Sequence, residues 1–344
     1  MYCTAAEPNK WQKFAGAEEA AYAILSLPFN KQNDMAQCCL AIYRITGERF
    51  YRDKAERIFN FMRSRFQYVD GYYCWNYWEP FGPWDVNPQT RMTRHFMNPH
   101  PVRNYQAGEI SQIADAYHTG IVFTKTDIER IIKTNLGAMW NKDRETPRFV
   151  NSNALLPKPE LTEEEKKAEA RKTAGCCWGA LMDFDETVRY MVEPRSRVGK
   201  TDCDSVLAVD YFANIIAKTP VSFARRHVKG DVKLPELQVS QCRSLTVATV
   251  MPHIVKTGRP SIVLCKSRIT QDLEIAVYSA DGKEKKLTLH KGQIKGGIDG
   301  MAGQFYIEWD GADPAGKVAL PKGEYRMRWT VPDGYREFPV SIVE

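Results

Sequence analysis

Residues 71–85 read GYYCWNYWEPFGPWD and place seven aromatic rings, two acids and two prolines in fifteen residues. The chain continues VNPQTRMTRHFMNPHPVRNYQAGE before the next expected helix. This connection of about thirty residues is far longer than the usual four to six, and long loops in compact domains often bind ligands or carry catalytic groups. The stretch is therefore the first candidate for a functional site.

Aromatic rings and polar groups in this arrangement are typical of sugar recognition. Sugars present flat C–H faces that stack on rings, while their hydroxyls need carboxylate, amide, imidazole and guanidinium groups at the ring edges. The residues we expect to bind such a substrate are Trp75, Tyr77, Trp78, Trp84, Asp85, Arg94 and His95.

Candidate catalytic residues lie in the same stretch and at the start of the following helix. Glycosidic cleavage needs an acid and a base, most often two carboxylates, and Glu79 or Asp85 with Glu109 can supply them. His100 and Tyr105 can instead act as base and acid in a lyase or epimerase that removes the proton α to a uronic-acid carboxylate. The sequence leaves these reaction types open.

A structural role fits the same residues. A tryptophan-rich loop over helix ends often covers the core, and each single aromatic is explained by packing alone. A lone histidine in a loop is more often structural or exposed than catalytic. Both interpretations of the stretch stay open at this point.

Composition excludes several functional classes. The 344 residues, 43% of them hydrophobic, suit a folded protein of two domains. The formal charge of +6 is spread along the chain without a basic block, so no nucleic-acid partner is expected. Nine cysteines without CxxC spacing indicate neither a zinc site nor a redox dithiol, so we expect no metal and no cofactor. The sequence contains no run of 18 apolar residues, so no membrane span is predicted.

The apolar period is helical from about Trp11 to Lys218. One stripe comprises Ala55, Ile58, Phe59, Met62 and Phe66, and a second comprises Met35, Cys38, Cys39 and Ile42; each predicts a partner helix. The sequence YRITGERFYRDKAERI is echoed 73 residues later by AYHTGIVFTKTDIERI, which predicts a repeated helical hairpin. Its glycines, Gly47 and Gly120, suit left-handed positions just past a helix end.

Beyond about Asp231 the period changes to that of strands. Seven short apolar segments, separated by turns such as Ala280-Asp281-Gly282-Lys283, predict a β-sandwich. This part resembles the FlgD-type immunoglobulin-like domain through VYSADGK at 277–283, Trp309-Asp310-Gly311, and the Asp313, Gly316, Gly323 and Tyr325 that follow. The resemblance covers most of residues 248–344 and implies an accessory module of bacterial extracytoplasmic proteins.

The helical half resembles the α/α-toroid proteins of the six-hairpin glycosidase type. The likeness rests on CLAIYRITGERFYRDKAERIFNFMRSR with the WNYW that follows it, and on HPVRNYQAGEISQIADAYHTGIVFTKTDIERIIKTNLGAMWN. It covers roughly residues 10–215 and implies a site at one end of a helical ring. A complete toroid uses about twelve helices, whereas we expect seven or eight here, so the ring is partial or the repeat is shortened.

These observations combine into one expectation: a multidomain protein with an all-α, toroid-like helical-hairpin domain at 1–230 and an all-β immunoglobulin-like sandwich at 231–344. The function expected first is that of a secreted bacterial carbohydrate-active protein, a glycoside hydrolase, polysaccharide lyase or uronyl epimerase acting on an oligo- or polysaccharide. The alternative is a non-catalytic glycan- or protein-binding surface or assembly protein that docks through the sandwich. The N-terminus shows no signal peptide, so the location is extracytoplasmic if a signal was removed and cytoplasmic otherwise.

Overall fold

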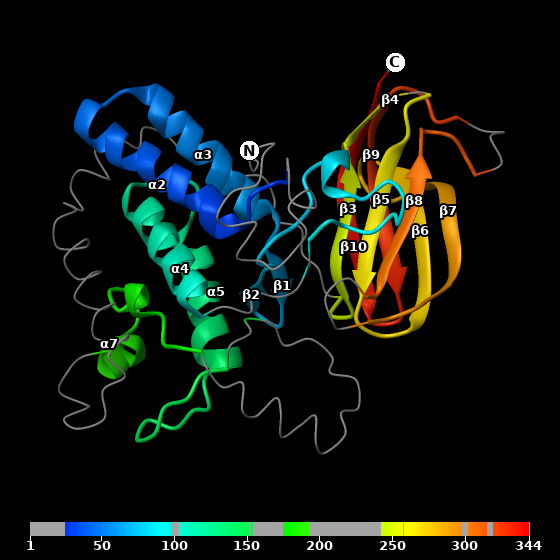
Figure 1. Ribbon diagram of the computed structural model, residues 1–344. Helices are drawn as coiled ribbons and strands as arrows, with labels where there is room; N and C mark the ends of the chain where they lie inside the picture. Colours follow the sequence, from blue (N-terminus) through cyan, green and yellow to red (C-terminus); the bar gives the residue numbers. More distant parts are fainter. Residues whose placement is uncertain are drawn as a thin grey trace.

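The computed structural model describes residues 25–95, 97, 103–150, 153, 175–192, 242–256, 258–297, 302–314 and 319–343. The N-terminal part of these ranges contains helices and a small sheet, and the C-terminal part contains two larger sheets (Figure 1). The expected boundary between residues 230 and 231 lies outside the described residues and stays a prediction.

Five α-helices make up most of the N-terminal part. They are α2 (Phe29–Thr46), α3 (Arg49–Ser64), α4 (Arg103–His118), α5 (Lys125–Lys133) and α7 (Glu186–Val192). Single turns of 3-10 helix lie at Pro83–Asp85 and Gly179–Leu181, and a π-helix follows α5 at Thr134–Met139. A two-stranded hairpin of β1 (Gln67–Val69) and β2 (Tyr72–Cys74) follows α3.

Glycine ends α2, as the sequence predicts. Gly47 has φ 72° and its N–H donates to the Tyr43 carbonyl at 2.7 Å, so the chain reverses into α3. Gly120 occupies the corresponding position after α4 with φ 75°. A residue with a side chain would be strained at either point, because glycine alone adopts such a positive φ without a steric penalty.

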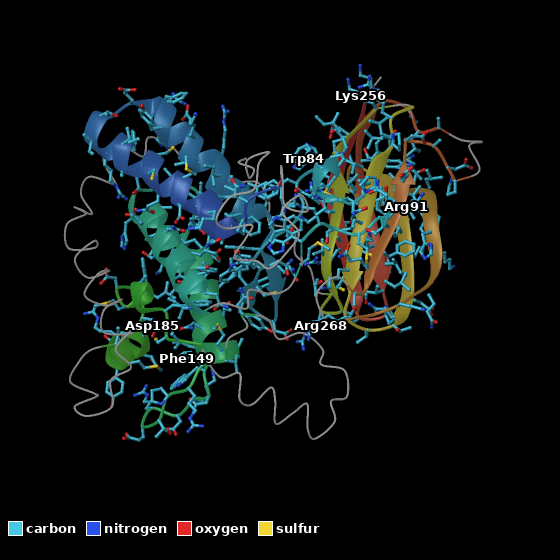
Figure 2. The ribbon with its side chains drawn as sticks, viewed as in Figure 1. Trp84, Arg91, Phe149, Asp185, Lys256 and Arg268 are labelled. Carbon is cyan, nitrogen blue, oxygen red and sulfur yellow. The ribbon has the colours of Figure 1, made fainter. Side chains whose placement is uncertain are left out.

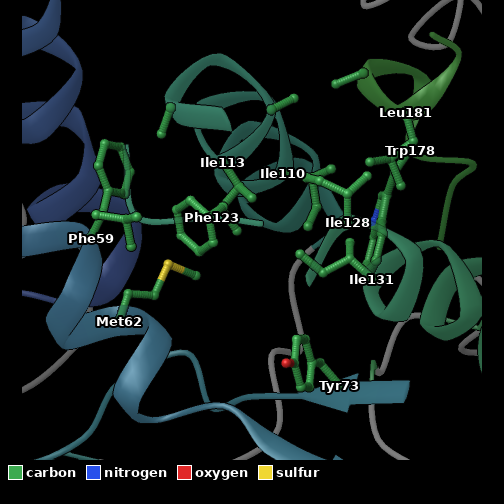
Figure 3. Close-up of a cluster of buried hydrophobic side chains, with 14 of the residues drawn as sticks. Phe59, Met62, Tyr73, Ile110, Ile113, Phe123, Ile128, Ile131, Trp178 and Leu181 are labelled. Carbon is green, nitrogen blue, oxygen red and sulfur yellow. The ribbon is translucent and has the colours of Figure 1, made fainter. Parts of the chain in front are cut away.

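The helices pack around one apolar core, which Figure 3 shows in close-up. Helix α3 buries Ala55, Phe59 and Met62, three members of its predicted stripe. For α2 the predicted stripe was wrong, because Met35, Cys38 and Ile42 are exposed and the helix instead buries a neighbouring face. That face comprises Phe29, Asn30, Gln32, Asn33, Ala36, Cys39, Leu40 and Tyr43.

The expectation of an all-α toroid was wrong. The described residues contain five α-helices, and strands in three sheets, without a closed ring of hairpins. The helical period was read correctly around α3, but such a period shows only that one helix face is buried and not what covers it. Here the WNYW stretch that carried the resemblance, residues 75–78, lies in the segment that follows β2, and Trp75 packs into the helical core.

The C-terminal part is a β-sandwich of eight strands. They are β3 (Leu245–Met251), β4 (Ile254–Lys256), β5 (Ser261–Ser267), β6 (Gln271–Ser279), β7 (Lys285–Ile294), β8 (Gln304–Trp309), β9 (Gly323–Val331) and β10 (Gly334–Val343). One sheet has the order β4-β10-β9-β6-β7 and the other the order β3-β5-β8. All neighbours are antiparallel except β4 and β10. The inner faces of both sheets supply one core, which includes Cys265, Val277, Met327 and Trp329.

A third apolar cluster joins the two parts, and we call it the joint. The N-terminal part contributes Leu25, Tyr77, Trp78, Val86 and Met97, and the outer face of the three-stranded sheet contributes Val247, Met251, Ile262, Leu264 and Tyr306. In Figure 1 the loop after β2 accordingly lies against β3 and β5. The outer face of a sheet is normally solvated and polar, so its apolar residues here are explained by the loop that covers them.

Polar contacts reinforce the joint at the edge of β3. The pairing of β3 with β5 shifts register between Leu245 and Val247, which leaves Thr246 in a bulge. The Thr246 carbonyl accepts hydrogen bonds from Gln67 Nε2 at 2.9 Å and Asn76 Nδ2 at 3.0 Å. A backbone acceptor at a sheet edge is thereby satisfied by the N-terminal part.

Candidate functional site

The first half of the aromatic segment is closed to solvent, since every residue from 72 to 80 is buried. Trp75 lies in the helical core, 1% exposed, with its ring centroid 5.2 Å from that of Phe66 and 5.7 Å from that of Trp178. Its Nε1 donates to Glu109 Oε2 at 2.8 Å, and Glu109 is itself fully buried. Trp75, predicted to bind substrate, and Glu109, predicted to act as a catalytic carboxylate, are thus hydrogen-bonded to each other inside the helical core.

Tyr77 and Trp78 belong to the joint. Trp78 is fully buried and its Nε1 donates to the Ser26 carbonyl at 2.7 Å. His95 packs against both rings, with its ring centroid 6.1 Å from that of Tyr77 and 5.4 Å from that of Trp78. Burial lowers the pKa of His95 to about 4, so the imidazole is neutral at physiological pH.

Glu79 holds an arginine that contacts the sandwich. Its Oε1 accepts from Asn76 Nδ2 at 2.8 Å, and its Oε2 lies 3.7 Å from Arg65 Nε. The Arg65 guanidinium in turn lies over the Phe61 ring and over the ring of Phe338 on β10, at 4.8 and 5.0 Å from the centroids. Burial raises the pKa of Glu79, and the neighbouring Arg65 partly opposes that shift.

The second half of the segment is organised by the buried carboxylate of Asp85. Its Oδ1 accepts from the Ser26 amide at 2.9 Å, and its Oδ2 accepts from the Ser26 hydroxyl at 2.7 Å and the Phe81 amide at 2.7 Å. A weaker bond from the Gly82 amide to Oδ2 measures 3.3 Å. Burial raises the pKa of Asp85 more than these bonds lower it. The carboxylate therefore fixes the turn that carries Trp84.

Trp84 is the ring of the segment that faces outward, and it lies between the helices and the sandwich (Figure 2). The ring is 41% exposed, and its Nε1 donates to Ser26 Oγ at 3.0 Å. A Cβ placed on Gly82 would lie 2.4, 2.4 and 2.6 Å from three consecutive carbons of the ring. Nearly equal distances to adjacent ring atoms mean that Gly82 sits against the face of the indole and not its edge.

Arg94 closes the turn that carries this ring. The Arg94 amide donates to the Asp85 carbonyl at 2.7 Å, and Nη1 donates to the Trp84 carbonyl at 2.9 Å. The two ends of the 85–94 turn are thus joined. Val86 and Thr93 form a β-bridge within the same turn.

Tyr105 is also exposed, to 39%, at the start of α4. Its ring stacks on that of Tyr77 with centroids 5.8 Å apart and planes 16° apart. The remaining candidate, His100, lies outside the described residues, so its place relative to Tyr105 stays a prediction.

The predicted site residues therefore fall into three groups. Trp75 and Glu109 pair in the helical core; Tyr77, Trp78, His95 and Tyr105 form a ring cluster at the joint; Trp84, Asp85 and Arg94 form the outward turn. Glu79 pairs with Arg65, whose guanidinium lies over Phe338 of the sandwich. Whether any of them binds or converts a substrate stays a prediction.

Two residues that organise the outward turn were missed by sequence reasoning. Ser26 is 59 residues from Asp85, and nothing in its local pattern marks it. Gly82 gave a usable signal, because a glycine two residues before a tryptophan permits a close approach of backbone and ring. In the described ranges no three His, Cys, Asp or Glu side chains gather as a set of metal ligands. None of the described helices combines the length and apolarity of a membrane-spanning segment.

Comparisons with known proteins place the chain in no family. No family model matches it, so the FlgD-type resemblance of residues 248–344 gains no support. No curated protein matches it either. Among solved structures, a β-glucosidase from Erythrobacter marinus shares 14% identity over 29% of this chain and 15% of that chain, with a TM-score of 0.20. This chain thus spans a small fraction of that enzyme, and a likeness at this score supports neither a shared fold nor a shared activity.

Proposed function

We propose that this chain is a carbohydrate-binding protein that holds its ligand on the exposed indole of Trp84. The observation that carries the proposal is the mounting of this ring, with Gly82 against one face of the indole while Trp84 stays 41% exposed. Its N–H is bonded to Ser26 Oγ, whose hydroxyl is bonded to Asp85. A ring held in this way loses little side-chain freedom when a ligand stacks on it.

The chemistry around the ring suits a sugar. A pyranose presents a flat C–H face to an indole, and its hydroxyls need polar groups at the ring edge. Arg94, whose Nη1 donates to the Trp84 carbonyl, can supply one. Tyr105 adds a second exposed ring, stacked on Tyr77 of the joint.

A binding role is supported better than a catalytic one. Glu79 and Glu109, the carboxylates expected to act as acid and base, are 5% and 0% exposed and serve internal contacts. The pKa of Glu79 is raised by burial between the two parts of the chain, a cause that structural ion pairs share with active sites. The hydrolase, lyase or epimerase assignment therefore stays a prediction, as does the extracytoplasmic location.

The test is a binding and turnover assay on the full chain with a panel of neutral and uronic-acid oligosaccharides. Trp84→Ala is expected to weaken binding about tenfold or more, which corresponds to about 1.4 kcal/mol. The matched control is Tyr190→Ala, which removes a ring of 45% exposure from α7 and is expected to leave binding unchanged.

A second variant tests the mounting itself. Gly82→Ala places a methyl group where the indole lies, so the ring must move, and sugar binding should fall although Trp84 is retained. No binding by the unmodified chain across the panel would contradict the proposal. Product formation abolished by Glu79→Gln or Glu109→Gln would replace it with the enzymatic function.

A further inference from the structure

One buried residue is bonded both to the joint and to the turn that carries Trp84. The Ser26 carbonyl accepts from Nε1 of Trp78, which belongs to the joint, at 2.7 Å. The Ser26 hydroxyl donates to Asp85 Oδ2 at 2.7 Å and accepts from Trp84 Nε1 at 3.0 Å. The position of the Trp84 ring therefore depends on Ser26, and the position of Ser26 depends on a ring that the sandwich covers.

A second connection reaches the same turn from β8 of the sandwich. Gln304 Oε1 accepts from the Thr93 amide at 2.9 Å, and Gln304 Nε2 donates to Thr93 Oγ1 at 2.8 Å. The Thr93 hydroxyl in turn donates to the His95 carbonyl at 2.7 Å. A side-chain amide that uses both its acceptor and its donor on one residue fixes that residue in two directions.

The outward turn transmits this contact to Trp84. Val86 and Thr93 form the β-bridge within the turn, and the Arg94 amide donates to the Asp85 carbonyl at 2.7 Å. Nη1 of Arg94 also donates to the Trp84 carbonyl at 2.9 Å. The end of the turn that the sandwich holds is thus bonded to the backbone of Trp84.

Docking of the sandwich is separable from the folding of either part. Among the described residues, the helical core and the sandwich core have no member in common, and the joint is a third cluster between them. An interface of this kind can loosen while the cores on both sides stay intact. The outward turn is bonded to this interface and would loosen with it.

We propose that the docked sandwich positions the sugar-binding ring, with Gln304 and Ser26 as positioning residues, so that docking and binding at Trp84 are coupled. The inference rests on the function proposed above and concerns the regulation of that site. A closed joint holds the indole in one orientation, and a ligand then stacks on it without first ordering it. An open joint lowers the populated fraction of that orientation and weakens apparent binding by the same factor. By linkage, a bound ligand strengthens docking equally.

The alternative is a turn that is rigid by itself. Asp85 Oδ2 also accepts from the Phe81 and Gly82 amides, at 2.7 and 3.3 Å, within the same segment. These bonds fix the backbone before Trp84. The backbone after Trp84 is fixed through Thr93, which the sandwich holds. The two explanations therefore differ in whether a residue of β8 affects the ring.

Gln304→Ala in the full chain tests the inference, because it removes both bonds to Thr93 and leaves Trp84 and Arg94 in place. We expect it to weaken oligosaccharide binding about fivefold or more, the lower range of coupling between two sites. The second measurement is fluorine NMR of the chain labelled with fluorotryptophan, in which Trp84→Phe identifies the Trp84 signal. That signal should shift or broaden in Gln304→Ala. The matched control, Gln293→Ala on β7, removes an exposed glutamine and should change neither quantity.

Thr93→Val repeats the test from the other side of the contact. It removes the acceptor of Gln304 Nε2 but keeps the Thr93 amide, so it should change both quantities in the same direction and by less. Circular dichroism checks that each variant is folded.

The outcomes separate this inference from the function on which it rests. Unchanged affinity in Gln304→Ala would overturn the coupling, whether or not the Trp84 signal moves, and would leave sugar binding at Trp84 intact. If the unmodified chain binds no sugar, the proposed function fails. The Trp84 signal then still decides whether the sandwich positions the ring, and an unchanged signal in Gln304→Ala would overturn that as well.

Discussion

Residues 72–80 and residues 81–94 both carry aromatic side chains, but their surroundings are opposite. Residues 72–80 are all buried, and their rings complete the helical core and the joint. Residues 81–94 form a turn on the surface, in which Asp85 is buried and Trp84 faces outward. An aromatic ring in the first half stabilises the fold, whereas Trp84 in the second is available to a ligand.

The difference comes from what each ring packs against. Trp75 meets Phe66 and Trp178 from two other segments, and Trp78 meets the outer face of a sheet. Trp84 has Gly82 against one face and bonds Ser26 through its Nε1, and it stays 41% exposed. A fully buried tryptophan stabilises the fold through the area it buries, while a partly exposed one contributes less to stability and leaves part of its surface accessible.

The largest effect expected from this comparison is the loss of Trp78. Trp78→Ala should lower the free energy of unfolding by about 3–5 kcal/mol, because it leaves a cavity in the joint. Urea denaturation followed by circular dichroism measures the change. Trp84→Ala should change the same quantity by less than about 1 kcal/mol, as most substitutions of exposed side chains do. Equal effects of the two substitutions would remove the distinction between the halves.

A smaller effect should appear in the pH dependence of stability. His95 has a pKa of about 4 in the folded chain and 6.5 as the ordinary value, so between these values the unfolded chain binds more protons. Stability contributed by the neutral imidazole is therefore present above pH 6.5 and is lost as the pH falls toward 4, by about 3 kcal/mol in total.

His95→Phe isolates this contribution, because it keeps a ring against Tyr77 and Trp78 but does not titrate. Glu79 and Asp85, whose pKa values are raised, act in the opposite direction in the acid range, so the quantity to compare is the slope of stability against pH in the two proteins. Identical slopes from pH 4 to 7 would show that His95 is not closed from solvent in the joint.

The smallest of these effects concerns the edge of β3. Gln67→Ala removes one of the two amides that donate to the Thr246 carbonyl, and should cost about 1 kcal/mol, typical of one hydrogen bond. The double variant with Asn76→Ala should cost more than the sum of the single variants, since the buried carbonyl then has neither donor. If the cost of the double variant equalled the sum of the two single costs, the two hydrogen bonds would act independently and this prediction would be wrong.

Local features of the fold could be predicted from the sequence, but the way its elements meet could not. Gly47 and Gly120 mark helix ends because only a left-handed residue lets the chain reverse there. The period of α3 places Ala55, Phe59 and Met62 in a core. The same reasoning chose the wrong face of α2, since Met35, Cys38 and Ile42 are as regularly spaced as the residues that are buried.

The candidate site was predictable only as a stretch of residues. Aromatic density drew attention to residues 71–85, but whether Trp78 or Trp84 is buried depends on Val247, Leu264 and Ser26, which are far away in the sequence. Glu79 illustrates the same limit. Its neighbours Arg65 and Phe338 are brought together by the docking of the sandwich, and no local spacing encodes that contact.

The apolar outer face of the three-stranded sheet has a consequence for the modularity of the chain. Val247, Ile262, Leu264 and Tyr306 lie on a surface that a free-standing sandwich would expose to water, next to an edge strand that has lost its covering amides. A sandwich excised from this chain would therefore be poorly soluble and prone to aggregate through that face. The C-terminal part is therefore not expected to be soluble by itself, because the residues that cover its apolar face lie more than a hundred positions earlier in the chain.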